Sequence, residues 1–485
     1  MRTRICLYIL LLAPLAAYWQ TAFSEFGMTT DYANLRASHE QPGQLVRESA
    51  ARGRPLYGAM LETSFSAISA VDQLRWLRIV TVVLLTLLGV VLWRQLYNSG
   101  WNEVEAACIG FGVVLLPSAQ VLVGWASAWP QALTLLLAAA GFSAIETEIE
   151  RGGMKRVIAL LGGCMIYAAA SLIYQANVLF ALVIVTAVLL VRTGREPLSD
   201  IWWCTFHVAA VIVGLLVGHL LMSLLFGNGV FHKEEQLAVG GLGFLLYPLP
   251  NSFALFALND DEFTGAVMYW LTALAVVTAI ILAYRKIVAS ADTAIRRRGI
   301  YAITALGSIT LLVCLVAADR IGTYRVLFPI AGILLVLMTY SLRTLAVKEK
   351  LRWKHYTGLA LIGIFIFSLA HRNSYQLIAE PQGIEWETMR TAVLRASFTK
   401  PVRVHIITAS LSDRTTARTY GDEFGSLSSD DPEVAKNMFR TALAERFPDK
   451  LPKGGSYVLA ASDAIPAPGS FDLLIDMRKI KPAAL

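Results

Sequence analysis

The chain of 485 residues is 56% hydrophobic and only 16% charged, and its formal net charge is +7. With a mean hydropathy of +0.56, this composition excludes a soluble domain of ordinary type, so most of the chain is expected to lie in lipid. The excess of basic residues falls on one side of the predicted membrane helices, so no nucleic-acid partner is expected.

Apolar runs long enough to cross a hydrocarbon core recur along residues 1–371. They are rich in Leu, Val and Ala and lack a two-residue period, which predicts helices rather than a barrel. The runs are about 16 to 24 residues long and begin near Ile5, Trp76, Glu105, Trp129, Val157, Val178, Trp203, Ala266, Gly299, Val326 and Tyr356. The predicted fold is an α-helical polytopic membrane protein with about 11 transmembrane helices and a small C-terminal exoplasmic α/β domain.

Basic residues gather in alternate short connections, as at Arg94, 285–286 and 296–298, whereas the opposite connections hold few cations. This asymmetry predicts a cytoplasmic N-terminus and an exoplasmic C-terminal domain. The exoplasmic segments lack cysteines and Asn-X-Ser/Thr acceptors, which favours a bacterial inner (plasma) membrane.

The membrane domain has two long exoplasmic loops, residues 21–73 and residues 227–263, and the first is too long to be a mere connector. In the first loop, the mixture of apolar and charged residues over 44–68 predicts one or two amphipathic helices on the membrane surface, with a solvated connector as the alternative. In the second, a Gly-rich apolar stretch over 239–249 either dips into the interface or caps the bundle.

Residues 372–485 have the composition of a soluble α/β domain, and the predicted topology places this domain on the exoplasmic side. Helices are predicted over 385–396 and 431–447, the second beginning at Asp431 and Pro432, and strands over 402–409, 457–461 and 471–477.

Ionisable residues are scarce in the middle of the predicted spans, which disfavours a pump or transporter. His207 and His219 lie in one apolar run but twelve positions apart, so packing or hydrogen-bonding roles are expected for both. The charged residues gather instead at the exoplasmic ends of the spans. This distribution is typical of chemistry at one face of the membrane.

Three short motifs at that face resemble those of the GT-C fold glycosyltransferases, which take a sugar from a polyprenyl-phosphate carrier. Residues 27–32 (Gly-Met-Thr-Thr-Asp-Tyr) place an acid shortly after the first span, and residues 53–56 (Gly-Arg-Pro-Leu) are similar to a segment of polytopic O-antigen glucosyltransferases. Residues 324–329 (Tyr-Arg-Val-Leu-Phe-Pro) are similar to an Arg-Tyr-Leu-Leu-Pro element of the wider superfamily. The motifs cover about twenty residues, and the C-terminal domain is outside the resemblance.

Transfer from a sugar phosphate needs a base for the acceptor hydroxyl and cations for the departing phosphate. Asp31 is the candidate catalytic base, and its alternative role is a helix cap or a loop ion pair. Arg54 and Arg325 are the candidate donor-phosphate ligands, with lipid headgroup contact as the alternative. Arg320 and Lys233 are weaker candidates for the same role.

The acceptor is expected to meet Asp260 and Asp261, which could bind its hydroxyls or a cation. Many members of the family carry paired acids in the first loop, whereas Thr30 precedes Asp31 here. The resemblance therefore does not extend to a metal site of adjacent carboxylates, and a divalent cation is left open.

The sequence thus predicts inverting transfer of a hexose from a polyprenyl-phosphate donor to a lipid-linked glycan, with membrane lipids as the surroundings. A polymerase or ligase of lipid-linked oligosaccharides is the first alternative, and it would rely on His232, Lys233 and Arg320. A non-enzymatic flippase of lipid-linked sugars is the second, and the absence of internal repeats counts against it.

Overall fold

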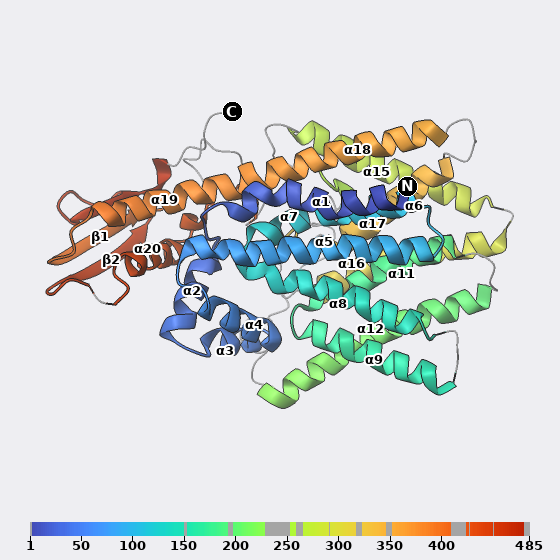
Figure 1. Cartoon of the computed structure of the whole chain (residues 1–485), viewed down its shortest axis with the longest axis horizontal. Helices are drawn as coiled ribbons and strands as arrows, with labels where there is room; N and C mark the ends of the chain where they lie inside the picture. The colour runs from blue at the N-terminus through green and yellow to red at the C-terminus, as the bar shows by residue number, and fades with distance from the viewer. Residues whose placement is uncertain are drawn as a thin grey trace.

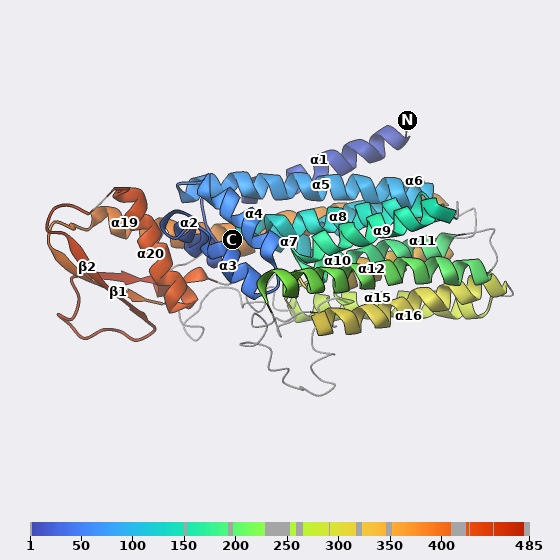
Figure 2. The ribbon, with the colours of Figure 1, turned by 90° about the horizontal axis from the view of Figure 1, so that it is seen from below.

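The computed structural model describes residues 2–149, 153–192, 197–227, 253–258, 265–290, 292–316, 323–345, 352–408, 423–425, 427–449 and 451–479. Most of these residues form a bundle of roughly parallel and antiparallel helices, and a small sheet domain lies beyond one end of it (Figures 1 and 2). The bundle consists of α1 (Arg2–Phe23), α5 (Arg75–Asn98), α6 (Glu103–Leu115), α7 (Pro117–Gly124), α8 (Trp129–Glu146), α9 (Gly153–Ser171), α10 (Gln175–Val178), α11 (Phe180–Val191), α12 (Pro197–Phe226), α15 (Gly265–Val288), α16 (Thr293–Val316), α17 (Phe328–Leu345) and α18 (Arg352–Ser374).

Each of the eleven predicted apolar runs falls on a helix or on a bent or interrupted helix pair, but the count of eleven spans is not confirmed. Six helices among the described residues are long and apolar enough to cross a membrane, namely 3–23, 71–98, 126–146, 153–171, 199–226 and 269–288. The pair α6 and α7 would be a seventh span, bent by 47° just before Pro117. Proline lacks a backbone N–H and disfavours helical geometry in the residue before it, which accounts for the bend.

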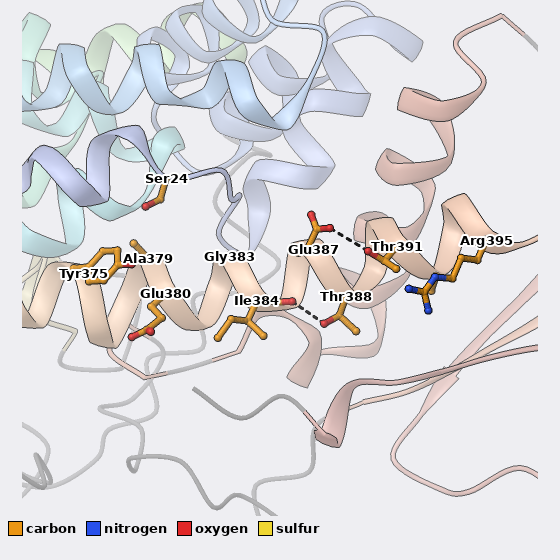
Figure 3. Close-up of a pocket in the computed structure, with 11 residues that line it drawn as sticks. Ser24, Tyr375, Ala379, Glu380, Gly383, Ile384, Glu387, Thr388, Thr391 and Arg395 are labelled. Carbon is orange, nitrogen blue, oxygen red and sulfur yellow. Dashed lines mark hydrogen bonds between the residues drawn. The ribbon is translucent and has the colours of Figure 1, made fainter. Parts of the chain in front are cut away.

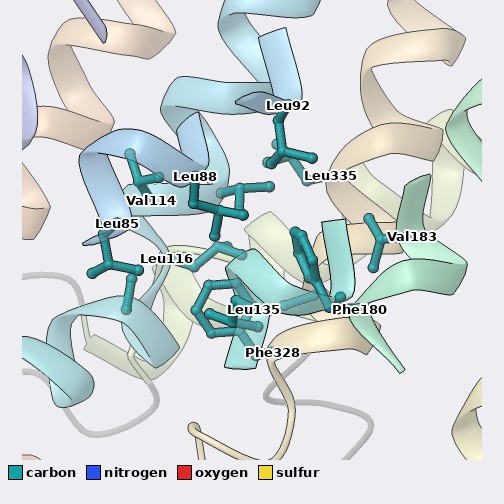
Figure 4. Close-up of a cluster of buried hydrophobic side chains, with 14 of the residues drawn as sticks. Leu85, Leu88, Leu92, Val114, Leu116, Leu135, Phe180, Val183, Phe328 and Leu335 are labelled. Atoms are coloured by element: carbon teal, nitrogen blue, oxygen red, sulfur yellow. The ribbon is translucent and has the colours of Figure 1, made fainter. Parts of the chain in front are cut away.

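The bundle core is made of aliphatic and aromatic side chains from facing helices. Leu85, Leu88 and Leu92 follow one side of α5 at helical spacing and point toward α6 and α8 (Figure 4). Phe180 of α11 and Phe328 of α17 meet edge to face with ring centroids 5.7 Å apart. The predicted all-helical membrane domain is confirmed at this level.

The first long loop folds into α2 (Thr30–Glu40), α3 (Gln44–Ala51), α4 (Pro55–Ser66) and the 3-10 turn η1 (Val71–Leu74). One or two helices are expected over 44–68, and the structure has two there, α3 and α4. They lie at the end of the bundle that is nearest the sheet domain (Figures 1 and 2).

The C-terminal residues form α19 (Glu380–Arg395), β1 (Pro401–Ile407), η7 (Ser428–Asp430), α20 (Pro432–Arg446), β2 (Ser456–Ser462), β3 (Leu473–Asp476) and η8 (Met477–Lys479). The strands form a parallel sheet in the order β2-β1-β3. Asp431 caps α20, as its sequence indicates, by accepting hydrogen bonds from the amides of Glu433 and Val434.

The two parts of the molecule are joined by a helical rod. A π-helical segment, η5 (Tyr375–Ala379), connects α18 to α19 without a break, so the boundary expected at residue 371 falls inside this rod (Figure 1). A second hydrophobic cluster mixes residues of the first loop, such as Tyr32 and Phe65, with Trp386 and Phe439 of the C-terminal domain. The first loop therefore shares a core with the C-terminal domain.

Candidate functional site

Asp31 lies in the first turn of α2 and is completely buried. One carboxylate oxygen accepts hydrogen bonds from the amides of Met28 (2.9 Å) and Ala126 (3.3 Å). The other accepts from the amide (2.9 Å) and the hydroxyl of Ser127. Burial raises the pKa of Asp31, and the bonds from Ser127 and Met28 and the charge of Arg78 offset part of that rise.

Arg78 of α5 is also fully buried and holds the turn before Asp31. Its guanidinium donates to the carbonyls of Ala22 (3.4 Å), Phe26 (2.9 Å) and Ser24, and it lies 4.1 Å from the centroid of the Phe26 ring. One cation thus satisfies three backbone acceptors where the chain leaves α1.

Arg54, at the start of α4, is held by Tyr174, which directly precedes α10, and by Gln175, the first residue of α10. Its guanidinium carbon lies 4.4 Å from the centroid of the Tyr174 ring, and its Nε donates to the side-chain carbonyl of Gln175 at 3.1 Å. Gln175 in turn donates to the carbonyl of Gly53 at 2.8 Å. The plane of this guanidinium is therefore fixed by stacking and by one hydrogen bond.

Arg325, just before α17, is held in the same manner. Its guanidinium carbon lies 4.2 Å from the centroid of the Trp125 ring, and its Nε donates to the Glu423 carboxylate at 3.0 Å. The second oxygen of Glu423 accepts from the amide of Tyr324 at 2.6 Å.

Tyr57 of α4 lies three residues after Arg54, and the charges of both arginines act on its hydroxyl. Burial raises the pKa of its hydroxyl to about 12, against the lowering effect of the positive charges of Arg325 and Arg54. The hydroxyl donates to the carbonyl of Ser127 at 2.8 Å. Tyr57 thus binds the residue that in turn binds Asp31.

The structure therefore brings together three of the seven sequence-predicted site residues: Asp31, Arg54 and Arg325. The other four, Lys233, Asp260, Asp261 and Arg320, lie outside the described residues. The alternative roles expected for Asp31 were a helix cap and a loop ion pair. In the structure its carboxylate instead joins two separate backbone segments, at Met28 and at 126–127.

Sequence reasoning missed Tyr57, Ser127, Arg78 and Glu423. Arg78 carried a usable signal, because an arginine three residues into an apolar run is costly in lipid unless it is paired. Tyr57 and Ser127 have no local signal, since their roles depend on partners far away in the sequence. Glu423 lies in a part of the C-terminal domain for which no element was predicted.

The described residues hold no cluster of three or more His, Cys, Asp or Glu side chains that could bind a metal ion. Both oxygens of Asp31 already accept hydrogen bonds from backbone or hydroxyl donors. The described part of this site therefore does not fit a metal at Asp31.

A groove of about 710 Å³ runs along the rod on α19 (Figure 3). Its lining includes the carboxylates of Glu380 and Glu387, the hydroxyls of Thr388 and Thr391, and Ser24, which directly follows α1. Ser24 relates the groove to the site, because its carbonyl is one of the three that Arg78 binds.

No family model matches the sequence, and no curated protein matches it. Among solved structures, the chain is similar to the crystal structure of the oligosaccharyltransferase of Archaeoglobus fulgidus in complex with Zn and sulfate. The match has a TM-score of 0.45 and 10% identity, and it covers 96% of this chain. The chain spans only 62% of the length of that protein, and a likeness this weak carries no conclusion about activity.

Proposed function

We propose that this chain is a membrane glycosyltransferase that moves a sugar from a polyprenyl-phosphate donor to an acceptor hydroxyl at the exoplasmic face. The observation that carries the proposal is that Tyr57, three residues after Arg54, donates to the carbonyl of Ser127, two residues after the Trp125 ring that Arg325 covers. These two arginines come from distant segments, and each is oriented by an aromatic ring.

Two oriented guanidinium groups suit a phosphate ester, because a guanidinium keeps its charge and donates through two parallel N–H groups. Among the described residues, the one hydrogen-bond partner of Arg54 is the Gln175 carbonyl at Nε. Its terminal nitrogens therefore remain for a ligand. Arg325 would bind the same phosphate while Glu423 fixes its Nε.

The proposed reaction is a single displacement. The acceptor oxygen attacks the anomeric carbon, the bond from that carbon to the phosphate oxygen breaks, and polyprenyl phosphate leaves with the bonding electrons. The acceptor proton passes to a base, and Asp31 remains the proposed base. Because both its oxygens accept hydrogen bonds, one of these bonds must be exchanged for the acceptor hydroxyl when substrate binds.

The finer features of the proposal rest on the sequence. They are a hexose donor, a lipid-linked glycan acceptor, acceptor contacts at Asp260 and Asp261, donor contacts at Lys233 and Arg320, and a bacterial inner membrane with the C-terminal domain outside. A divalent cation is also one of these finer features, and its ligands would lie outside the described residues.

The test is an assay of purified protein in detergent with radiolabelled polyprenyl-phosphate hexose and a cell-envelope lipid extract. Label should move to a new lipid-linked product with the wild type and not with Asp31→Asn. If the protein instead joins lipid-linked oligosaccharides, it is a polymerase. If it moves substrate across vesicle membranes without covalent change, it is a flippase.

A further inference from the structure

A short segment of the C-terminal domain contacts both halves of the candidate site. This segment, residues 423–430, is called the strap here, and the structure describes it at 423–425 and 427–430. Glu423 at its start binds Arg325, and Ser428 near its end binds Thr29. Thr29 and Ser428 are 399 positions apart in the chain, and Arg325 and Glu423 are 98 positions apart.

The strap is anchored to the helical rod. The amide of Gly425 donates to the carbonyl of Leu377 in η5 at 2.7 Å. Glu385 of α19 is fully buried, and its two oxygens accept from the amides of Ser428 (2.8 Å) and Ser429 (2.9 Å). A buried carboxylate that receives N–H donors in this way fixes the backbone of the strap against the rod.

On the Asp31 side, the strap holds a strained backbone. Thr29 has φ of 43° and ψ of −102°, which a β-branched residue adopts only when its surroundings require it. Its amide donates to the Ser428 hydroxyl at 2.8 Å, and that hydroxyl donates to Gln382. The preceding amide, that of Met28, points at Asp31. The contact from Ser428 therefore supports the turn that orients the proposed base.

On the Arg325 side, Glu423 is fully buried and binds two consecutive residues. It accepts from the amide of Tyr324 at 2.6 Å and from Nε of Arg325 at 3.0 Å. Glu423 thereby fixes the Nε side of the guanidinium against the strap.

We infer that the strap is a positioning element that sets the turn bearing Asp31 and the guanidinium of Arg325 at a fixed distance from each other. Glu423 and Ser428 are its positioning residues, and neither touches substrate. The effect of the strap on catalysis rests on the proposed function. Its effect on the positions of the two segments does not. It also assigns the C-terminal domain a role, which is to complete the site.

The experiment compares Ser428→Ala, Glu423→Gln and the wild type in two measurements on the full-length protein in detergent. The control is Asp472→Asn, which removes the carboxylate of another arginine pair in the same domain, between Asp472 and Arg403 on the sheet. The first measurement is amide hydrogen exchange followed by mass spectrometry. The second is the transfer rate constant with polyprenyl-phosphate hexose.

We expect Ser428→Ala to speed exchange at residues 27–31 and Glu423→Gln to speed exchange at residues 324–327, each by about tenfold or more. The transfer rate constant should fall by about tenfold or more in both variants, because a small misplacement of reacting groups is costly. The midpoint of thermal unfolding of both variants should stay close to that of Asp472→Asn. Asp472→Asn should have the exchange and the transfer rate constant of the wild type.

Unchanged exchange at either segment would overturn the inference. Faster exchange with a wild-type rate would overturn its catalytic part, since the strap would then be a structural joint only. If the wild type itself transfers no sugar from any such donor, the proposed function fails, and the exchange result alone decides whether the strap holds the two segments.

Discussion

The hydroxyl of Tyr57 donates a 2.8 Å hydrogen bond to the carbonyl of Ser127, and the amide of Ser127 donates at 2.9 Å to the carboxylate of Asp31. This relationship joins the first loop to the bend between α7 and α8, where the 3-10 turn η2 (Ala126–Ala128) lies. Two hydrogen bonds therefore connect Tyr57 to the proposed base through Ser127.

Replacing Ser127 with Ala should shift the pH dependence of transfer. The Ser127 hydroxyl donates to the ionised carboxylate and lowers the pKa of Asp31, so its loss should raise that pKa further. A base acts in its deprotonated form, so the acid limb of kcat against pH should move up by about one pH unit. The exposed Ser66→Ala is the matched control, and an unmoved limb would mean that Asp31 does not titrate in the catalysed step.

Replacing Arg54 with Ala should raise KM for the donor by about tenfold or more, because charge-assisted hydrogen bonds to the phosphate are lost. Arg54→Lys should recover only part of the affinity, since an ammonium group neither stacks on Tyr174 as a plane nor donates through a fork. Donor titration measures both effects. Arg52, two residues earlier and exposed, is the control, and an equal loss in Arg52→Ala would point to general attraction of anionic lipid.

Replacing Arg78 with Met should lower the free energy of unfolding by about 3 kcal/mol, because three backbone carbonyls and the Asp31 carboxylate lose their cation. Thermal unfolding in detergent measures the change. Arg94→Met, at the exposed opposite end of α5, should unfold close to the wild type. Equal midpoints for the two variants would contradict the role of Arg78.

Replacing Gly58 with Ala should destabilise the protein by about 1 to 3 kcal/mol. A Cβ atom at Gly58 would lie 2.5 Å from the carbonyl oxygen of Leu45, so α3 and α4 would have to separate. Gly162→Ala is the counterpart, because nothing lies within 4 Å of its Cβ position and it should be neutral or slightly stabilising. Thermal midpoints that do not separate the two variants would argue against this close helix contact.

The orientation in the membrane can be tested with single cysteines at two exposed positions. Val458 on β2 is 70% exposed and Met154 at the start of α9 is 72% exposed. With a membrane-impermeant maleimide on spheroplasts, Val458→Cys should be labelled at once and Met154→Cys only after permeabilisation. The reverse pattern would invert the predicted topology.

Several elements could be predicted closely from sequence because their cause is local. The strand expected over 402–409 is β1 over 401–407, and the helix expected over 431–447 is α20 with Asp431 as its cap. The number of spans was predicted less well. Apolar composition does not reveal a bend such as that before Pro117, and it does not distinguish shorter apolar helices such as 175–191 from full spans.

The site was predicted in part. Asp31, Arg54 and Arg325 were found because motifs mark them, but the burial of Asp31 among N–H donors was not. Glu423 could not be found, since a carboxylate becomes the partner of Arg325 only when the C-terminal domain folds back onto the bundle.

The sequence by itself determined that this is a protein of membrane helices with a small sheet domain near its C-terminus, because transfer of apolar segments into lipid depends on composition over about twenty residues. Only the tertiary structure decided which side chains meet: Tyr57 with Ser127, Glu423 with Arg325, and Ser428 with Thr29. These contacts join segments distant in sequence, and their hydrogen bonds form only after the helices pack, so no local pattern encodes them.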